Sequence, residues 1–172
     1  GKPVYADLIR ENLIDIRDDG TFKLDMKYFD YATGLRMTSR HFHTLFGGQP
    51  REPESEVTQR EMDLAASVQV VLEEVILKLA HTLCEETGLK NFCLSGGVAL
   101  NCVANGKLLE SGIVDNLWIQ PAAGDAGGAL GAAQVLYHHY YNGPRKVLPG
   151  DAMQGSYLGP AFTDEEIRQW ID

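Results

Sequence analysis

Two glycine-rich segments hold the residues best able to bind a ligand. In the first, Gly96 and Gly97 follow a short apolar run, and Val98 leads into a helical pattern that begins at Ala99. Paired glycines permit the φ values of a sharp turn and let a ligand approach the backbone closely. The helix after them offers free N–H groups and the positive end of its dipole. Asn101, one turn into that helix, could extend its amide to a ribose hydroxyl. The segment therefore predicts a nucleotide-binding turn, with a ligand-free strand–helix turn as the alternative.

The second segment covers residues 120–133, where a strand pattern ends and a helix begins with a face of glycine and alanine. Small residues spaced four apart let a backbone or a ligand press directly on a helix. The glycines at its start are Gly124, Gly127 and Gly128. Asp125 lies at the junction of strand and helix. It can be interpreted as a plain N-cap or as a metal ligand, because a carboxylate beside a binding turn is well placed to hold a cation.

The histidines and cysteines give weaker signals. His41 and His43 would share one face of a strand, which fits a metal pair or, more simply, a polar surface pair. His138 and His139 lie near a helix end, where they can bond to terminal carbonyls. The three cysteines include no C-x-x-C pair, so we expect buried, reduced thiols. Such thiols are typical of a reducing compartment, here the cytoplasm.

The surrounding patterns place both segments in an α/β fold. Apolar residues recur at helical spacing from Thr58, an N-cap that forms a capping box with Glu61, to Gly88, a C-terminal stop. A strand and a helix then alternate twice, with strands at residues 91–95 and 117–120 and helices at residues 99–109 and 126–140. This alternation predicts a sheet flanked by helices.

The first third of the chain predicts β and irregular structure. Residues 13–17 and 21–26 alternate apolar and charged side chains around an Asp-Asp-Gly turn, which indicates a β-hairpin. A linker rich in glycine and proline follows. We therefore predict a hairpin region at residues 1–55 and a second unit, which contains both glycine segments, at residues 56–172; the resemblance described below implies that this second unit binds adenosine.

Composition limits the partners of this chain. Its 172 residues, of which 44% are hydrophobic, suffice for one globular core. The net charge of −9 argues against nucleic acid as a partner, because nucleic-acid binders present a basic face. No apolar run reaches the roughly 18 residues of a membrane span, so we expect no membrane partner. A small anionic ligand fits, because backbone N–H groups can bind phosphate without Lys or Arg.

Both glycine segments resemble those of the acetate-kinase, sugar-kinase, heat-shock protein and actin superfamily. More narrowly, the chain is similar to the carbamoyltransferases of nodulation-factor and antibiotic biosynthesis. The similarity runs from about residue 40 to 172 and is carried, in order, by Phe46-Gly47 and residues 50–53, 63–69, 96–105, 120–133 and 157–160. It implies a fragment of a larger protein, containing the second half of the nucleotide-binding domain of that superfamily.

The resemblance implies an enzyme that makes carbamoyl-adenylate from carbamoyl phosphate and ATP and passes the carbamoyl group to a hydroxyl of a small molecule. It implies that Gly96 and Gly97 contact adenosine, that Asn101 lies at the ribose, and that Asp125 is one ligand of Fe²⁺ or a similar metal. The other ligands of the family are two histidines spaced His-x-x-x-His, a motif that this chain lacks. We expect them in the rest of the parent polypeptide, and the fragment alone to be inactive.

Two other interpretations stay open. One is a relative that forms threonylcarbamoyl-adenylate for tRNA modification, which should show a more basic surface. The other is a nucleotide-binding or structural module without chemistry of its own.

Overall fold

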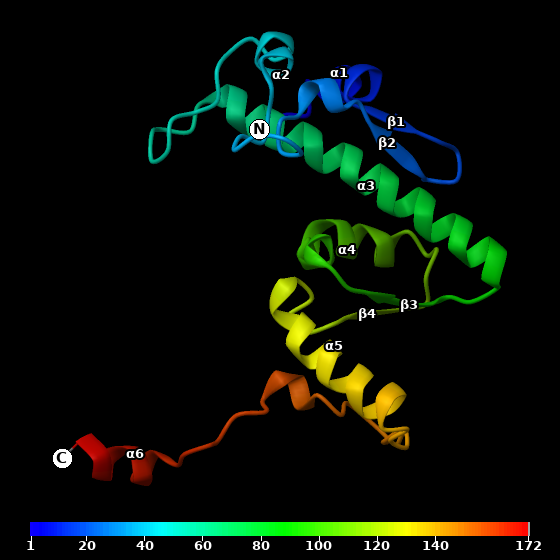
Figure 1. Cartoon of the computed structure of the whole chain (residues 1–172), viewed down its shortest axis with the longest axis vertical. Coiled ribbons are helices and arrows are strands. Elements are labelled where there is room, and N and C mark those ends of the chain that lie inside the picture. The colour runs from blue at the N-terminus through cyan, green and yellow to red at the C-terminus, as the bar shows by residue number, and fades with distance from the viewer. Residues whose placement is uncertain (172) are drawn as a thin grey trace.

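The computed structural model describes residues 1–171. One long helix runs between the N-terminal elements and the rest of the chain (Figure 1). This helix, α3 (Gln59–Thr87), contacts the N-terminal elements along its first half. Its second half contacts α4 (Cys102–Glu110), which lies between α3 and a small sheet. Two hydrophobic cores therefore share a single helix.

The ends of α3 confirm the predicted capping residues. The Glu61 carboxylate accepts hydrogen bonds from the Thr58 hydroxyl and, at 3.0 Å, from the Thr58 backbone N–H. At the other end, Gly88 has a left-handed φ of 68°, and its N–H donates to the Cys84 carbonyl at 2.9 Å. Both terminal bonds satisfy backbone groups that a helix leaves unpaired.

The N-terminal region contains the predicted hairpin together with helices that the sequence did not predict. β1 (Ile14–Ile16) pairs antiparallel with β2 (Phe22–Leu24), which confirms the hairpin. The expectation of a wholly β and irregular region is wrong, because α1 (Ala6–Asn12) and α2 (Arg40–Leu45) are helical, as is the 3₁₀ turn η1 (Met26–Tyr28). Helices this short are marginal alone and form where tertiary packing holds them.

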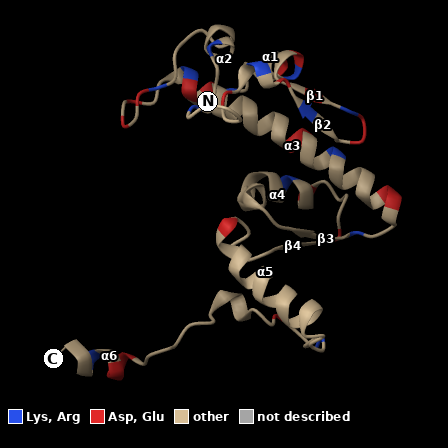
Figure 2. Ribbon diagram, viewed as in Figure 1, with Lys and Arg blue, Asp and Glu red and all other residues tan. Residues whose placement is uncertain are grey.

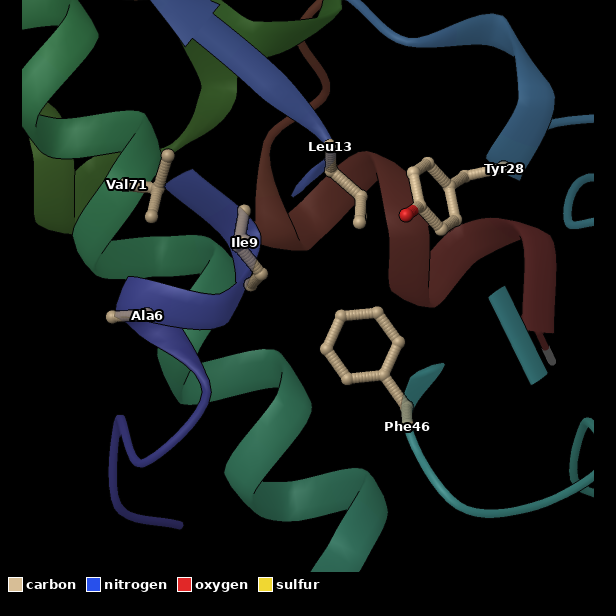
Figure 3. Packing of buried hydrophobic residues seen from close by; sticks show 6 residues of the cluster. All are labelled: Ala6, Ile9, Leu13, Tyr28, Phe46 and Val71. Carbon is tan, nitrogen blue, oxygen red and sulfur yellow. The ribbon is translucent and has the colours of Figure 1, made fainter. Parts of the chain in front are cut away.

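That packing is the first core, shown in Figure 3. Its buried side chains come from α1, the turn η1, the end of α2 and α3: Ala6, Ile9, Leu13, Tyr28, Phe46 and Val71. The Phe46 ring lies 5.5 Å from the Tyr5 ring, edge to face, and 4.5 Å from the Phe42 ring. Such aromatic contacts stabilise beyond the area that they bury.

The second core confirms the α/β class. β3 (Asn91–Leu94) and β4 (Asn116–Ile119) pair in parallel, with Phe92 opposite Leu117. Because side chains alternate along a strand, the apolar face of this sheet packs on α4 and α3, while Trp118 on the other face is exposed. The buried members of this core are Ala80, Leu108 and Val114.

The C-terminal part differs from the single helix predicted at residues 126–140. It contains a 3₁₀ turn, an α-helix and a π-helix, namely η3 (Asp125–Gly127), α5 (Gly128–Val135) and η4 (Leu136–Tyr140). No residue of these three elements is buried. The short turn η5 (Gln154–Ser156) and the exposed helix α6 (Asp164–Ile171) follow.

No helix within residues 1–171 joins the length and the apolar character that crossing a bilayer requires. The division of the chain at residue 55 stays a prediction.

The capping box of α3 should give stability a characteristic pH dependence. The Thr58 hydroxyl and then the Arg60 guanidinium lower the pKa of Glu61 from 4.5 to about 2. A lowered folded-state pKa contributes stability that is present above pH 4.5 and is lost as the pH falls towards 2. We predict that Glu61→Gln lowers the free energy of unfolding at neutral pH, and that its deficit relative to the wild type shrinks across this acidic window.

Urea unfolding of the two proteins at a series of pH values measures this difference. Glu56→Gln, at an exposed position just before the helix, is the matched control and should show no deficit. A deficit of constant size from neutral pH to pH 2 would contradict the role of the Glu61 carboxylate.

Candidate nucleotide site

The two glycine segments meet at one edge of the sheet. β3 and β4 are parallel, so their carboxyl ends lie side by side and lead directly into the two segments. The Gly96 N–H donates to the Ala123 carbonyl at 2.7 Å. A Cβ added to Gly124 would lie 4.0 Å from the Gly97 Cα. The turns that sequence reasoning paired are therefore in direct contact.

The backbone of the first turn requires glycine at one position and leaves space around both. Gly96 has φ 98° and ψ 165°, a conformation essentially restricted to glycine. A Cβ added to Gly96 or Gly97 would meet nothing within 4 Å. Val98 is exposed in the 3₁₀ turn η2 (Gly97–Leu100) that follows. The turn thus presents backbone and open space, as an approaching nucleotide would need.

The second turn contains glycines of two kinds. A Cβ added to Gly127 would lie 2.3 Å from the Ala122 carbonyl oxygen, so only glycine fits this turn. Ala122 itself has a positive φ of 54°. A Cβ added to Gly128 meets nothing within 4 Å, so its lack of a side chain leaves surface open at the start of α5.

Asn101 has a different place from the one predicted. The expected helix at residues 99–109 begins later, at Cys102, and Asn101 is its N-cap rather than a residue one turn inside it. Its Oδ1 accepts the Ala104 N–H at 3.0 Å, and its own N–H donates to the Val98 carbonyl at 3.0 Å. Asn side chains bond readily to nearby backbone N–H groups, which favours the cap over the helix interior.

A polar network that sequence reasoning missed surrounds this cap. Asn101 Nδ2 donates to Gln69 Oε1 at 2.7 Å, and Gln69 Nε2 lies 3.1 Å from Asn101 Oδ1. Gln69 Nε2 also donates to Glu73 Oε1 at 2.8 Å, and the Lys107 ammonium bonds to Glu73 Oε2. Glu73 is 5% exposed. The sequence signals were a pair of polar residues one turn apart on α3 and the place of Gln69 at the end of residues 63–69, one of the segments that carry the resemblance.

Opposing effects set the charge of Glu73. Burial acts to raise its pKa, but the hydrogen bonds from Lys107 and Gln69 outweigh burial and hold the pKa below the ordinary value. Glu73 is therefore a carboxylate at neutral pH, and it can only accept hydrogen bonds.

Asp125 is exposed at the edge of the same site, where it begins η3. The N-cap positions of η3 and α5 are Gly124 and Gly127, so the interpretation of Asp125 as an N-cap is wrong. Among residues 1–171, no three His, Cys, Asp or Glu side chains gather closely enough to hold a metal. On this chain Asp125 can provide a single ligand only.

Figure 2 shows that the strands and turns of the site carry little charge. Residues 91–106 and 116–124 contain no Asp, Glu, Lys or Arg, and Asp125 is the first carboxylate after β4. The net charge of −9 therefore lies mostly away from these turns, and a polyphosphate near them would not meet a cluster of carboxylates.

The other candidate residues lie outside this site. His41 and His43 belong to α2 instead of a strand. His43 is buried, and its Nε2 lies 3.0 Å from the Thr38 hydroxyl. The interpretation of the two histidines as a polar surface pair is therefore wrong. His138 Nδ1 contacts the Gly143 carbonyl at 3.1 Å, which lies in the segment after η4 and is not one of the terminal helix carbonyls that were expected.

The three cysteines are free thiols, but the expectation that they are buried is wrong. Cys84 is half-buried, and the other two, Cys93 and Cys102, are exposed. Cys93 lies on the outward face of β3, and Cys102 is the first residue of α4.

The two kinds of glycine predict opposite responses to alanine. Gly127→Ala should lower the free energy of unfolding by about 1–3 kcal/mol, because the new methyl group forces the turn to shift. Gly128→Ala, the matched neighbour, should raise it by up to about 1 kcal/mol, because alanine restricts the unfolded chain and meets open space. Urea unfolding measures both. Equal changes in the free energy of unfolding for the two substitutions would show that Gly127 has as much space for a methyl group as Gly128 does.

Comparison with known proteins identifies a family model and several relatives that match this chain. A family model described as the carbamoyltransferase N-terminus matches residues 1–134. The chain is 61% identical over 171 residues to an uncharacterized protein, sll1178, of Synechocystis sp., a match that covers 99% of this chain and 28% of that protein. The match from residue 1 includes the hairpin, so the similarity begins earlier than residue 40.

Nodulation proteins are similar over a shorter stretch. The chain is 45% identical over 113 residues to NolNO of Sinorhizobium fredii, covering 65% of this chain and 16% of that protein. It is 43% identical over 115 residues to NolO of Bradyrhizobium diazoefficiens, covering 66% of this chain and 21% of that protein. The chain thus spans less than a third of the length of each of these relatives. Because the family model covers residues 1–134 of the 172, the chain belongs to the carbamoyltransferase family.

Proposed function

We propose that this chain is the adenosine-binding part of an enzyme that forms carbamoyl-adenylate from carbamoyl phosphate and ATP. The enzyme then passes the carbamoyl group to a hydroxyl of a small molecule. The observation that carries this proposal is the contact between the two glycine turns, in which the Gly96 N–H donates to the Ala123 carbonyl at 2.7 Å. Membership of the family supports carbamoyl transfer, and the open glycine turn supports a nucleotide as co-substrate.

The proposed role of these residues is to position the nucleotide. Reactions at phosphate and carbonyl groups depend mainly on the placement of the reactants and on fixed dipoles near developing charge. Gly96 and Gly97 let the backbone approach adenosine, and Asn101 supplies a side-chain amide for the ribose. Gly124 lets the second turn lie close to Gly97, Gly127 permits the tight turn at Ala122, and Gly128 leaves open surface for the ligand at the start of α5.

Asp125 is proposed as one ligand of Fe²⁺ or a similar metal whose other ligands lie in the rest of the parent polypeptide. The exposure of this carboxylate beside the nucleotide turn supports that role. A transition metal needs several ligands in a fixed geometry, and residues 1–171 supply no such group. We therefore assign no step of the reaction to a metal held by this chain alone.

The exposed elements η3, α5 and η4 support the rest of the parent polypeptide as the partner of this chain. Val135, Leu136 and Tyr137 are each at least half exposed beside the Gly and Ala residues of α5. An exposed apolar surface of this kind marks a contact with another part of a protein. We propose that the chain is the second half of a nucleotide-binding domain of the actin and sugar-kinase type, completed by segments outside it.

A second candidate is a nucleotide-binding or structural module without chemistry. The observation in its favour is that Asn101 caps α4 and pairs with Gln69, so a structural role already accounts for the hydrogen bonds of its side chain. A tRNA-modifying relative is less well supported, because the net charge is −9. The exposed free thiols support a reducing compartment, which we propose to be the cytoplasm.

The central test is incubation of the complete parent protein with ATP and carbamoyl phosphate, followed by mass spectrometry. We predict a carbamoyl-adenylate that requires both substrates. A parent protein that binds ATP without forming the adenylate would support the module instead.

Asp125 can be tested in the same assay. We predict that Asp125→Asn abolishes carbamoyl transfer and leaves ATP affinity within about twofold, because the carboxylate forms no cap that the fold requires. Asp115→Asn, at an exposed position beside the opposite end of β4, is the matched control and should retain activity. Full transfer activity in Asp125→Asn would remove Asp125 from the site.

A further inference from the structure

We propose that Gln69 and Glu73 on α3 are positioning residues for the nucleotide, because they fix the side chain of Asn101 and through it the first glycine turn. This inference rests on the proposed function, which places adenosine at that turn. Neither residue lies in a glycine segment, and both act on the site through Asn101.

The network clamps α4 at separate points along its length. Gln69 and Glu73 are one helical turn apart and share a face of α3. Gln69 bonds to Asn101 at the N-cap of α4, at 2.7 and 3.1 Å, and Glu73 bonds to Lys107 further along the same helix. The Gln69 Nε2–Glu73 Oε1 bond of 2.8 Å joins the two contacts. α4 can therefore neither slide nor rotate against α3 without breaking several bonds.

Chemistry alone fixes which way each amide points. A carboxylate only accepts, so the Gln69 atom that faces Glu73 is the donor Nε2, and Oε1 is left for Asn101. A backbone N–H only donates, so the Asn101 atom that faces Ala104 is the acceptor Oδ1. The polarity of the network thus runs from the Glu73 carboxylate to the N-terminus of α4.

This polarity determines what Asn101 can offer to a ligand. Its Oδ1 already accepts from Ala104 and from Gln69, which uses its capacity as an acceptor. Its Nδ2 donates one hydrogen to Gln69 and retains the other. Asn101 can therefore meet a ligand only as an N–H donor, which suits the oxygen of a ribose hydroxyl.

The same residue holds the turn. The Asn101 backbone N–H donates to the Val98 carbonyl at 3.0 Å. The 3₁₀ turn Gly97–Leu100 therefore ends at Asn101, the residue whose side chain bonds to Gln69. A shift of Asn101 would move both its side-chain donor and the backbone of Gly97. Both are groups that the proposed function places against adenosine.

The network adds a direction to a contact that apolar packing already makes. Glu73 is buried, whereas the Lys107 side chain is 51% exposed, so their ion pair lies at the edge of the interface between α3 and α4. α3 and α4 already pack through Leu108 and Ala80, which are 0% and 2% exposed. A charged network added beside such a core supplies a defined orientation, which an apolar contact cannot.

The test uses the complete parent protein and compares KM for ATP with KM for carbamoyl phosphate. Gln69→Glu removes both Nε2 donors and places a carboxylate against Glu73. We expect KM for ATP to rise about three- to tenfold, the equivalent of one or two hydrogen bonds, and KM for carbamoyl phosphate to stay unchanged. Gln69→Met removes the same bonds without added charge and serves if Gln69→Glu does not fold.

Two further variants separate positioning from stability. Combining Gln69→Glu with Glu73→Gln should recover part of the ATP affinity, because the amide at position 73 can donate to the carboxylate at position 69. Glu74→Gln is the matched control on the same helix, where it disturbs the 2.8 Å contact with Arg10 of α1 and leaves α4 untouched. It should leave KM for ATP unchanged.

Deoxynucleotides provide the decisive readout. We expect the wild type to bind ATP more tightly than 2′-deoxy-ATP or 3′-deoxy-ATP, and Gln69→Glu or Gln69→Met to lose that preference. A wild type that binds no ATP would overturn the proposed function and this inference together. A wild type that binds ATP with a ribose preference that the Gln69 variants keep would overturn this inference alone.

Discussion

The parallel pairing of β3 and β4 is the constraint on which the site depends. Parallel strands end at the same edge of a sheet, so their following turns become neighbours however far apart they lie in sequence. Here that edge joins the Gly96 N–H to the Ala123 carbonyl. Antiparallel pairing of the same strands would place the turns at opposite ends of the sheet. The connection through α4 is what makes parallel pairing possible, because parallel strands need a long crossover.

A two-stranded sheet is not stable by itself. The long helix α3 stabilises it by packing apolar side chains against one of its faces. α3 contributes Ala80 to the core under the sheet and Val71 to the core under the hairpin. Because α3 is capped at both ends and contributes to both cores, the fold can be stable although its strands are short. They also place Gln69, midway along the helix, against the N-cap of α4 at the site.

Local signals in the sequence predicted the parts of the fold that depend on local chemistry. Thr58 and Gly88 bracket α3 because capping requires nothing from outside the helix, and the first glycine turn follows from a φ at Gly96 that other residues avoid. The sequence did not predict α1, which is held by packing, or the start of α4, where Asn101 preferred the cap. The partnership of Gln69 with Asn101 joins residues far apart in the chain, so no local pattern could reveal it.

The two glycine turns of the site differ in how many of their contacts lie within this chain. The first turn is complete within the chain, since Asn101 is fixed by Gln69 and by the backbone of α4. The second turn has exposed Asp125 beside it and leads into α5, which buries no residue. Under the proposed function, the first turn would provide a preorganised contact for adenosine, whereas the Asp125 carboxylate would need further ligands from the rest of the parent polypeptide.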